Sequence, residues 1–331
     1  MAPIPERLLL AHARGEVLFI VGAGVSRDAG LPDFRKLVVK VYKSLDPPVY
    51  SIISDIATSN DNGKDPDFSN LHDIQKAEVK RFQNGEYDVV LGMLERRLEG
   101  QENAQSPVRL EIARILRCRK PRPAPNHRHL IRLADRGGVT TIATTNFDLL
   151  LEIAAKNMRQ PIQTYTLGGI PRPTRQQEFS GVLHIHGVLD RNPNKASDLI
   201  ISDRDFGEFY LRRRVVPDLI YDAVRLFHLV LIGYSANDSP MRYLLNSVAA
   251  DAERFSDLKE RFVFVGMRKD DPVELADWRA RGITPIPYDV NGKDHSHLQR
   301  TLAKWVDFSK INDNRRVDAA MKRIVRAYVI G

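Results

Sequence analysis

Four apolar segments of the sequence end in small or polar residues that could bind a nucleotide. These residues form a glycine-rich loop, an amide and a carboxylate, an imidazole, and a glycine-serine turn: Gly22, Ala23, Gly24, Ser26, Asn146, Asp148, His186, Gly233 and Ser235. Glycines let backbone N–H groups approach a diphosphate, and a helix N-terminus that follows them favours negative charge. His186 is a candidate general base because imidazole titrates near neutrality, and the Asn146 amide suits orienting a water molecule or a ribose hydroxyl.

Short apolar, β-branched runs precede these residues, and we predict that they are strands. The runs are 17–21, 139–145, 181–185, 229–234, 261–267 and 283–289. Most are apolar almost continuously, as expected for strands that helices cover on both faces. Helical patterns at 149–158, 241–255 and 273–282 separate several of them. This alternation predicts an α/β fold with a doubly wound, Rossmann-like parallel sheet, whose ligands bind outside the carboxyl ends of the strands.

More than a hundred residues separate the first two predicted strands, which is too many for one crossover. Helical patterns at 36–45, 70–82, 87–100 and 108–118 predict a helical insertion over 36–135, ended by the proline-rich segment 119–130. The sheet domain would then comprise 1–35 and 136–307. An amphipathic pattern predicts a C-terminal helix over 308–331, and we expect it to lead to a further domain.

The composition narrows the function classes. Among the 331 residues, 43% are hydrophobic and Cys118 is the single cysteine, which excludes an internal disulfide and a cysteine-rich metal site. No apolar run approaches the ~20 residues of a membrane helix, and the N-terminus does not resemble a signal peptide, so we predict a cytoplasmic protein without a membrane partner. The net charge is +8, but basic residues are mixed with acidic ones, and direct nucleic-acid binding is not expected.

Two other kinds of site need consideration. Histidine pairs at 127/129, 184/186 and 295/297 have a spacing that can ligate metal, yet no Cys or Glu cluster accompanies them, so we expect no metal site. We place His184 either in the core or directly behind the site residues. Ser235 lies on a strand-to-helix turn, with Asp289 and His295 downstream in the order of a serine hydrolase. Asn237 occupies the position where a nucleophile elbow has glycine.

Four motifs together resemble those of the sirtuins. The segment GAGVSRDAGLPDFR at 22–35 resembles the sirtuin signature, and TTNFD at 144–148 resembles the Thr-Gln-Asn-x-Asp motif with Thr145 in place of glutamine. His186-Gly187 matches the catalytic His-Gly, and GYS at 233–235 corresponds to Gly-Thr-Ser. The motifs occur in the same order between residues 17 and about 290. The resemblance implies a sirtuin-like fold and NAD binding.

The resemblance also implies roles for individual residues. Asn146 and His186 would be catalytic. Asp33, Phe34 and Arg35 would belong to the loop over the nicotinamide end of NAD, with Phe34 shielding the ribose and Arg35 pairing with the diphosphate. Asp148 would bind the nicotinamide carboxamide. The small residues 22–24, together with Ser26, Gly233 and Ser235, would hold the rest of the dinucleotide.

The departures from the sirtuin pattern bear on the activity. One cysteine cannot supply the four-cysteine zinc module of protein deacylases, so no zinc is expected. The chain is more similar to bacterial sirtuin-like effector domains, which hydrolyse NAD to nicotinamide and ADP-ribose in phage-infected cells. This similarity implies an NAD glycohydrolase with NAD as substrate, controlled in a homo-oligomer, by a sensor or activator protein, or by a fused C-terminal domain. The alternatives are an NAD-dependent protein deacylase and a non-catalytic NAD or ADP-ribose sensor.

Overall fold

The fold is built on a seven-stranded parallel sheet. In the computed structural model the described residues are 3–58, 67–98, 106–117, 121–135, 140–156, 162–167, 169, 181–189, 199–234, 245, 257–267, 272–290 and 294–309. The strand order is β3-β4-β2-β1-β5-β6-β7, and every pairing is parallel. The strands are β1 (Val17–Val21), β2 (Thr141–Thr144), β3 (Thr164–Thr166), β4 (Gly181–His184), β5 (His228–Ile232), β6 (Arg261–Met267) and β7 (Thr284–Asp289). The predicted doubly wound α/β class is confirmed.

Most of the strands lie where the sequence pattern predicts them. The runs 17–21 and 261–267 match β1 and β6 residue for residue, and the other runs match their strands to within a few residues. The short strand β3 was not predicted, because Thr-Tyr-Thr is too short and too polar to give an apolar run. The predicted helix 241–255 falls outside the described residues, apart from Leu245.

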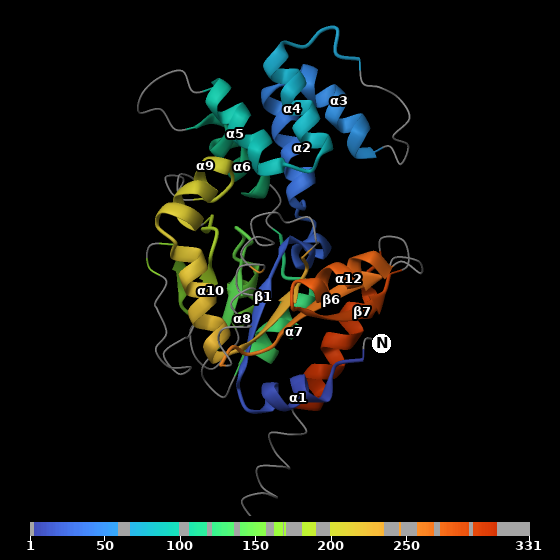
Figure 1. The fold of residues 1–331 in the computed structure, drawn as a ribbon, viewed down its shortest axis with the longest axis vertical. Coiled ribbons are helices and arrows are strands. Elements are labelled where there is room, and N and C mark those ends of the chain that lie inside the picture. The colour runs from blue at the N-terminus through green and yellow to red at the C-terminus, as the bar shows by residue number, and fades with distance from the viewer. Residues whose placement is uncertain are drawn as a thin grey trace, which may run out of the picture.

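Helices cover both faces of the sheet, which explains its continuously apolar strands (Figure 1). One face packs on α1 (Glu6–Ala13), α7 (Pro125–Ala134), α8 (Leu150–Ala155) and the helical residues 296–309. The other face packs on α10 (Val215–Leu226) and α12 (Pro272–Ala280). Along β1, Phe19 faces the first of these cores and Ile20 the second, and both side chains are fully buried.

Five of the helices between β1 and β2 form a separate apolar core beyond the carboxyl end of β1 (Figure 1). They are α2 (Phe34–Leu45), α3 (Pro47–Thr58), α4 (Asp73–Gln83), α5 (Tyr87–Leu98) and α6 (Pro107–Arg117). Val41, Ile53 and Phe82 lie at the centre of this core and are almost completely buried. Leu199 and Ile201 of the sheet domain also pack into it, so the two parts share an apolar contact.

Prolines begin several helices of the chain, whereas the prolines of segment 119–130 were predicted to end one. Helix α3 starts at Pro47, and α7 starts at Pro125 inside the segment that was expected to end a helix. Proline suits the first turn of a helix because its missing N–H has no partner there in any case. Helix α7 lies within the range predicted as the insertion, yet it packs against the sheet.

Two short elements, which were also not predicted, extend from the sheet domain toward the insertion. Helix α9 (Asp203–Phe206) continues directly into the π-helical segment η4 (Gly207–Arg212). Within the described parts of the chain, no helix has the length and apolar character needed to cross a membrane. The predicted C-terminal helix lies almost entirely outside the described residues.

Candidate functional site

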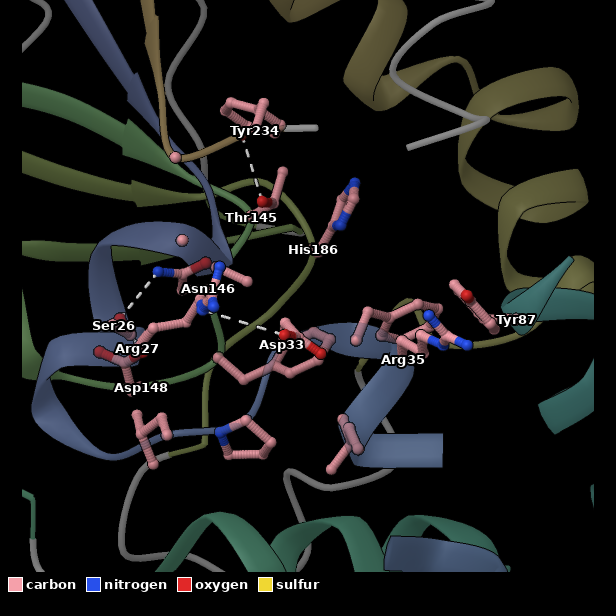
Figure 2. A pocket seen from close by; sticks show the side chains of 18 of the residues that line it. Ser26, Arg27, Asp33, Arg35, Tyr87, Thr145, Asn146, Asp148, His186 and Tyr234 are labelled. Carbon is pink, nitrogen blue, oxygen red and sulfur yellow. Dashed lines mark hydrogen bonds and ion pairs between the residues drawn. The ribbon is translucent and has the colours of Figure 1, made fainter. Parts of the chain in front are cut away.

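A cavity of about 510 Å³ lies between the carboxyl ends of the central strands and the helical insertion (Figure 2). Its lining includes most of the predicted site residues: Ala23, Gly24, Ser26, Asp33, Phe34, Arg35, Asn146, Asp148, His186 and Gly233. Gly22 lies in the same loop but does not line the cavity, and Ser235 falls outside the described residues. The structure therefore brings together residues from four strand ends.

The glycines after β1 and β5 allow two loops to pack in direct contact. The N–H of Gly22 donates to Ile232 O at 2.8 Å, and the N–H of Gly24 donates to Gly233 O at 2.9 Å. A Cβ atom on Gly22 would lie 2.7 Å from Gly233 O, and Gly233 itself has a φ of 77°. The N–H groups of Gly22 and Gly24 themselves already have backbone acceptors, and the approach of other N–H groups of this loop to a diphosphate stays a prediction.

Ser26 is the centre of a buried hydrogen-bond network, which we call the Ser26 network (Ser26, His127, Asn146 and Asp148). Its hydroxyl donates to Asp148 Oδ2 at 2.9 Å and accepts from Asn146 Nδ2 at 3.0 Å. The third partner is His127 Nε2 at 3.2 Å. Asn146 Nδ2 also donates to Gly22 O at 3.2 Å. The Ser26 hydroxyl has one donor and two acceptor sites, and its three partners occupy all of them. The side chains around Ser26 are therefore held in place.

The geometry around His127 assigns its tautomer. The backbone N–H of Ala124 donates to His127 Nδ1 at 3.2 Å, so the ring proton belongs on Nε2, from which it points to Ser26. Burial lowers the pKa of His127, and the charge of Asp148 acts in the opposite direction. His127 thus donates to Ser26 as a neutral ring.

Asn146 is held from two sides. Its backbone carbonyl accepts from His184 Nδ1 at 2.9 Å, and His184 Nε2 lies 2.8 Å from Glu152 Oε1. His184 is fully buried and bonds to a predicted site residue, so it fits both positions predicted for it, the core and the layer behind the site. Because the Asn146 amide nitrogen serves the Ser26 network, Oδ1 remains as the group without a hydrogen-bond partner among the described residues.

His186 sits in a much less polar environment. Its Nε2 lies 2.6 Å from the hydroxyl of Tyr210, and the Phe206 ring packs edge-on at 5.5 Å between centroids. Only 6% of His186 is exposed, and burial lowers its pKa to about 3. The expectation that His186 titrates near neutrality is therefore wrong, because the ring is desolvated with no carboxylate beside it. At neutral pH it is an uncharged hydrogen-bonding group.

Residues 33–35 lie at the cavity, and the Arg35 side chain extends toward Tyr87 of the insertion (Figure 2). Asp33 caps α2 by accepting from the Lys36 N–H at 2.9 Å. The Phe34 ring packs edge-on to Tyr87, with 6.4 Å between the centroids.

The guanidinium of Arg35 is engaged by the insertion. It donates to Ile56 O at 3.0 Å and lies over the Phe82 ring at 5.8 Å from the centroid. Its pairing with a diphosphate remains a prediction, and it would require the side chain to leave these contacts.

Asp148, which was predicted to bind the nicotinamide carboxamide, also stabilises the start of α8. Its Oδ1 accepts from the Leu150 N–H at 3.0 Å, where α8 begins, while Oδ2 accepts from Ser26. Thr145, which replaces the glutamine of the sirtuin motif, contacts the hydroxyl of Tyr234 at 3.1 Å. This pair links the carboxyl end of β2 to the loop after β5.

Neither rival site is assembled among the described residues. No group of three or more His, Cys, Asp or Glu side chains in these ranges could hold a metal ion. His295 Nδ1 contacts the Tyr288 hydroxyl at 2.9 Å, whereas Asp289 Oδ2 lies 3.4 Å from His297. Asp289 and His295 are therefore not paired as a serine hydrolase would require.

Several lining or contacting residues were not predicted from the sequence. The sequence analysis considered His127 only as a metal ligand. His127 lies in α7, the helix directly before β2, and this position could have indicated that it lies near Asn146. Tyr87 of α5 and Tyr210 of η4 reach the site from elements that carry no motif, and nothing in the local sequence marked them. Asn126, which is 2% exposed, also lines the cavity and donates to Asp28 Oδ2 at 3.3 Å.

Comparisons with known proteins give a family match, a relative and a solved structure. Residues 140–286 match the model of the SIR2-like domain family. The uncharacterized protein y4cA of Sinorhizobium fredii (strain NBRC 101917 / NGR234) is 32% identical over 295 residues, which is 87% of this chain but only 22% of that protein. A solved structure from work on the mechanism and regulation of Sir2 enzymes aligns with 94% of this chain and 100% of its own, at 15% identity and a TM-score of 0.42. Residues 140–286 of the chain are therefore similar to the SIR2-like domain family.

Proposed function

We propose that the protein is an NAD glycohydrolase, which cleaves the nicotinamide–ribose bond with water to give nicotinamide and ADP-ribose. The observation that carries the proposal is the placement of Asn146 and His186 on neighbouring strand ends around one cavity (Figure 2). Each side chain keeps one polar atom without a partner among the described residues, Oδ1 in Asn146 and Nδ1 in His186. The match to the SIR2-like family supports a role in NAD chemistry.

The cavity is suitable for a dinucleotide in size and polarity. Its volume of about 510 Å³ falls within the range of roughly 300–1,000 Å³ that is usual for ligand sites. The Ser26 network supplies fixed polar groups on one side, and the rings of Phe34 and Phe206 supply apolar surface elsewhere on the lining. An apolar lining with a few fixed polar groups is typical of a small-molecule site.

The reaction needs little acid–base chemistry from the protein. Water attacks C1′ of the ribose, the C–N bond breaks, and its electron pair passes to the pyridinium nitrogen, so nicotinamide leaves as a neutral molecule. Asn146 Oδ1 would accept a hydrogen bond from the attacking water and hold it in line. His186 would accept a hydrogen bond from a hydroxyl of the ribose or from the water. One proton of the water stays on the new hydroxyl of ADP-ribose, and the other passes to the solvent. The lowered pKa of His186 suits a group that orients, rather than one that retains the proton.

We further propose that this activity depletes NAD during defence against phage, as the resemblance implies. Such an enzyme must be held inactive until infection. A homo-oligomer, an activator protein or a further domain of a longer protein could provide this control, and the relative y4cA is several times longer than the matched region.

The test is nicotinamide release from NAD, followed by chromatography for the wild type, Asn146→Ala and His186→Ala. We expect both variants to lose at least about 100-fold in kcat, because each removes a group that positions the reaction. Matched controls are Asn84→Ala and His72→Ala, which change the same residue types at exposed positions of the insertion. Wild-type turnover in both site variants would contradict the assignment.

The alternatives predict different products. A deacylase would release nicotinamide only with an acetyl-lysine peptide and would form O-acetyl-ADP-ribose. A sensor would bind NAD in calorimetry and release no nicotinamide, even in the presence of its activator. Linear ADP-ribose formed from NAD and water alone would favour the hydrolase.

A further inference from the structure

Tyr210 is the hydrogen-bond partner of His186 on the side away from the Ser26 network. Its hydroxyl lies 2.6 Å from His186 Nε2, and the two rings meet edge-on at 5.9 Å between centroids. Tyr210 is 7% exposed and His186 is 6% exposed, so little water reaches the contact. Among the described residues, the other ring nitrogen of His186, Nδ1, has no hydrogen-bond partner.

This asymmetry matters because an uncharged imidazole carries one N–H and one lone pair. Burial keeps His186 uncharged at neutral pH. If Nε2 holds the proton, it donates to the tyrosine oxygen and leaves the lone pair of Nδ1 for the cavity. If Nδ1 holds the proton, the tyrosine donates to Nε2 and the cavity receives a donor. The contact at Nε2 therefore decides which kind of group the substrate meets.

The position of Tyr210 is fixed by the helical insertion. Tyr210 lies in the π-helical segment η4, which continues from α9. Arg109 of α6 donates to both oxygens of Asp205 in α9 at 2.8 Å. Arg96 of α5 pairs with Asp203 at 3.0 Å. Both contacts are charged hydrogen bonds to α9, so η4, which continues from α9, is tied to the insertion at its N-terminal end. Helical turns of the π type occur frequently at functional sites.

We propose that Tyr210 is a positioning residue of the hydrolase: its hydroxyl accepts the N–H of His186 Nε2 and so presents the Nδ1 lone pair to the cavity. The proposal rests on the proposed function for its catalytic consequence, but the proton position is a property of the protein alone. Tyr210 itself does not line the cavity. It acts through His186, in the way that outer partners orient the ligating nitrogens of metal-bound histidines.

The experiment compares the wild-type chain with Tyr210→Phe, which removes only the hydroxyl. The ¹⁵N shifts of the histidine rings distinguish the two tautomers, and the His186→Ala variant identifies the signals of His186. We expect the wild type to hold the proton on Nε2 and Tyr210→Phe to shift part of the population to Nδ1. In the nicotinamide assay, kcat should fall about 10- to 100-fold while KM changes less than about threefold, because orientation is lost and binding is retained.

The matched control is Tyr50→Phe, on a helix of the insertion away from the cavity lining, and it should leave both readouts unchanged. A wild-type spectrum with the proton on Nδ1 would overturn the proposal, even if Tyr210→Phe did not fold. An unchanged tautomer in folded Tyr210→Phe, or a rise in turnover, would overturn it as well. If the wild type releases no nicotinamide even in the presence of its activator, the proposed function fails while the spectra still decide the role of Tyr210.

Discussion

The two sides of the cavity stabilise their polar groups in opposite ways. On one side, the Ser26 hydroxyl has three side-chain partners: Asp148 at 2.9 Å, Asn146 at 3.0 Å and His127 at 3.2 Å. On the other side, His186 has the single partner Tyr210 among the described residues and is otherwise enclosed by rings.

The two sides therefore contribute differently to the site: one fixes the positions of its polar groups, and the other changes the protonation of a single group. The Ser26 network fixes geometry through redundancy, since Asn146 keeps a second acceptor in Gly22 O if one bond is lost. The His186 side changes the chemistry of one group, since desolvation removes its charge and one contact sets its tautomer. We therefore expect the second side to be more sensitive to changes in the elements that enclose it.

Arg109→Ala should have the largest effect, because it releases the His186 side from the insertion. Arg109 pairs with Glu95 and with Asp205 at 2.8 Å, and the exposed fractions of these three side chains are 13%, 7% and 14%. Truncation leaves two nearly buried carboxylates without their cation, so the free energy of unfolding should fall by about 3–5 kcal/mol. Urea unfolding followed by circular dichroism measures the change.

Arg114→Ala on the same helix is the matched control. Its side chain is 61% exposed and pairs with Glu111, so its removal should cost less than about 1 kcal/mol. Equal losses in the two variants would contradict the view that burial makes the Arg109 contacts important.

The sequence predicted the sheet side of this comparison far better than the insertion side. Asn146, Asp148 and Gly233 follow continuous apolar runs, so a parallel sheet places them at one edge regardless of the details. The site residues that depend on the insertion could not be placed this way. Tyr210 and Phe206 contact His186 from α9 and η4. Arg109 and Arg96 hold α9 through ion pairs that join positions about a hundred residues apart.

The sequence also could not predict which way individual side chains point. Arg35 is the last residue of the segment that resembles the sirtuin signature, yet it donates to Ile56 O because α3 lies beside it. The titration of His186 was predicted wrongly for the same reason, since desolvation by the elements around it is a tertiary property.

Ser26→Ala should have a smaller effect on stability than Arg109→Ala and should test the redundancy of the polar side. The change removes an acceptor from His127 and Asn146 and a donor from Asp148, so we expect the free energy of unfolding to fall by about 1–3 kcal/mol. Nicotinamide release should fall by about 10-fold rather than vanish, because Gly22 O still holds the Asn146 amide.

Ser44→Ala is the control for this change. Ser44 accepts a hydrogen bond of 3.4 Å from the exposed Arg114 side chain and lies away from the cavity lining. A loss of turnover in Ser26→Ala as complete as in Asn146→Ala would show that the network is not redundant.

The smallest effect concerns the pH dependence of stability. The pKa of His186 falls from 6.5 to about 3 on folding, so between these values the unfolded chain binds a proton that the folded chain does not. The free energy of unfolding therefore decreases as pH falls below about 6.5, with a limiting slope of about 1.4 kcal/mol per pH unit for one proton. Replacing His186 with glutamine removes this contribution.

The comparison of wild type with His186→Gln isolates the group from other histidines, such as His127, whose pKa burial also lowers. Between about pH 6.5 and 5.5, the wild type should lose about 1 kcal/mol more than His186→Gln, measured by urea unfolding at each pH. His72→Gln, at an exposed position of the insertion, is the matched control. Equal losses in wild type and His186→Gln would mean that His186 takes up its proton within the folded protein, and the apolar side of the cavity would then be open to water.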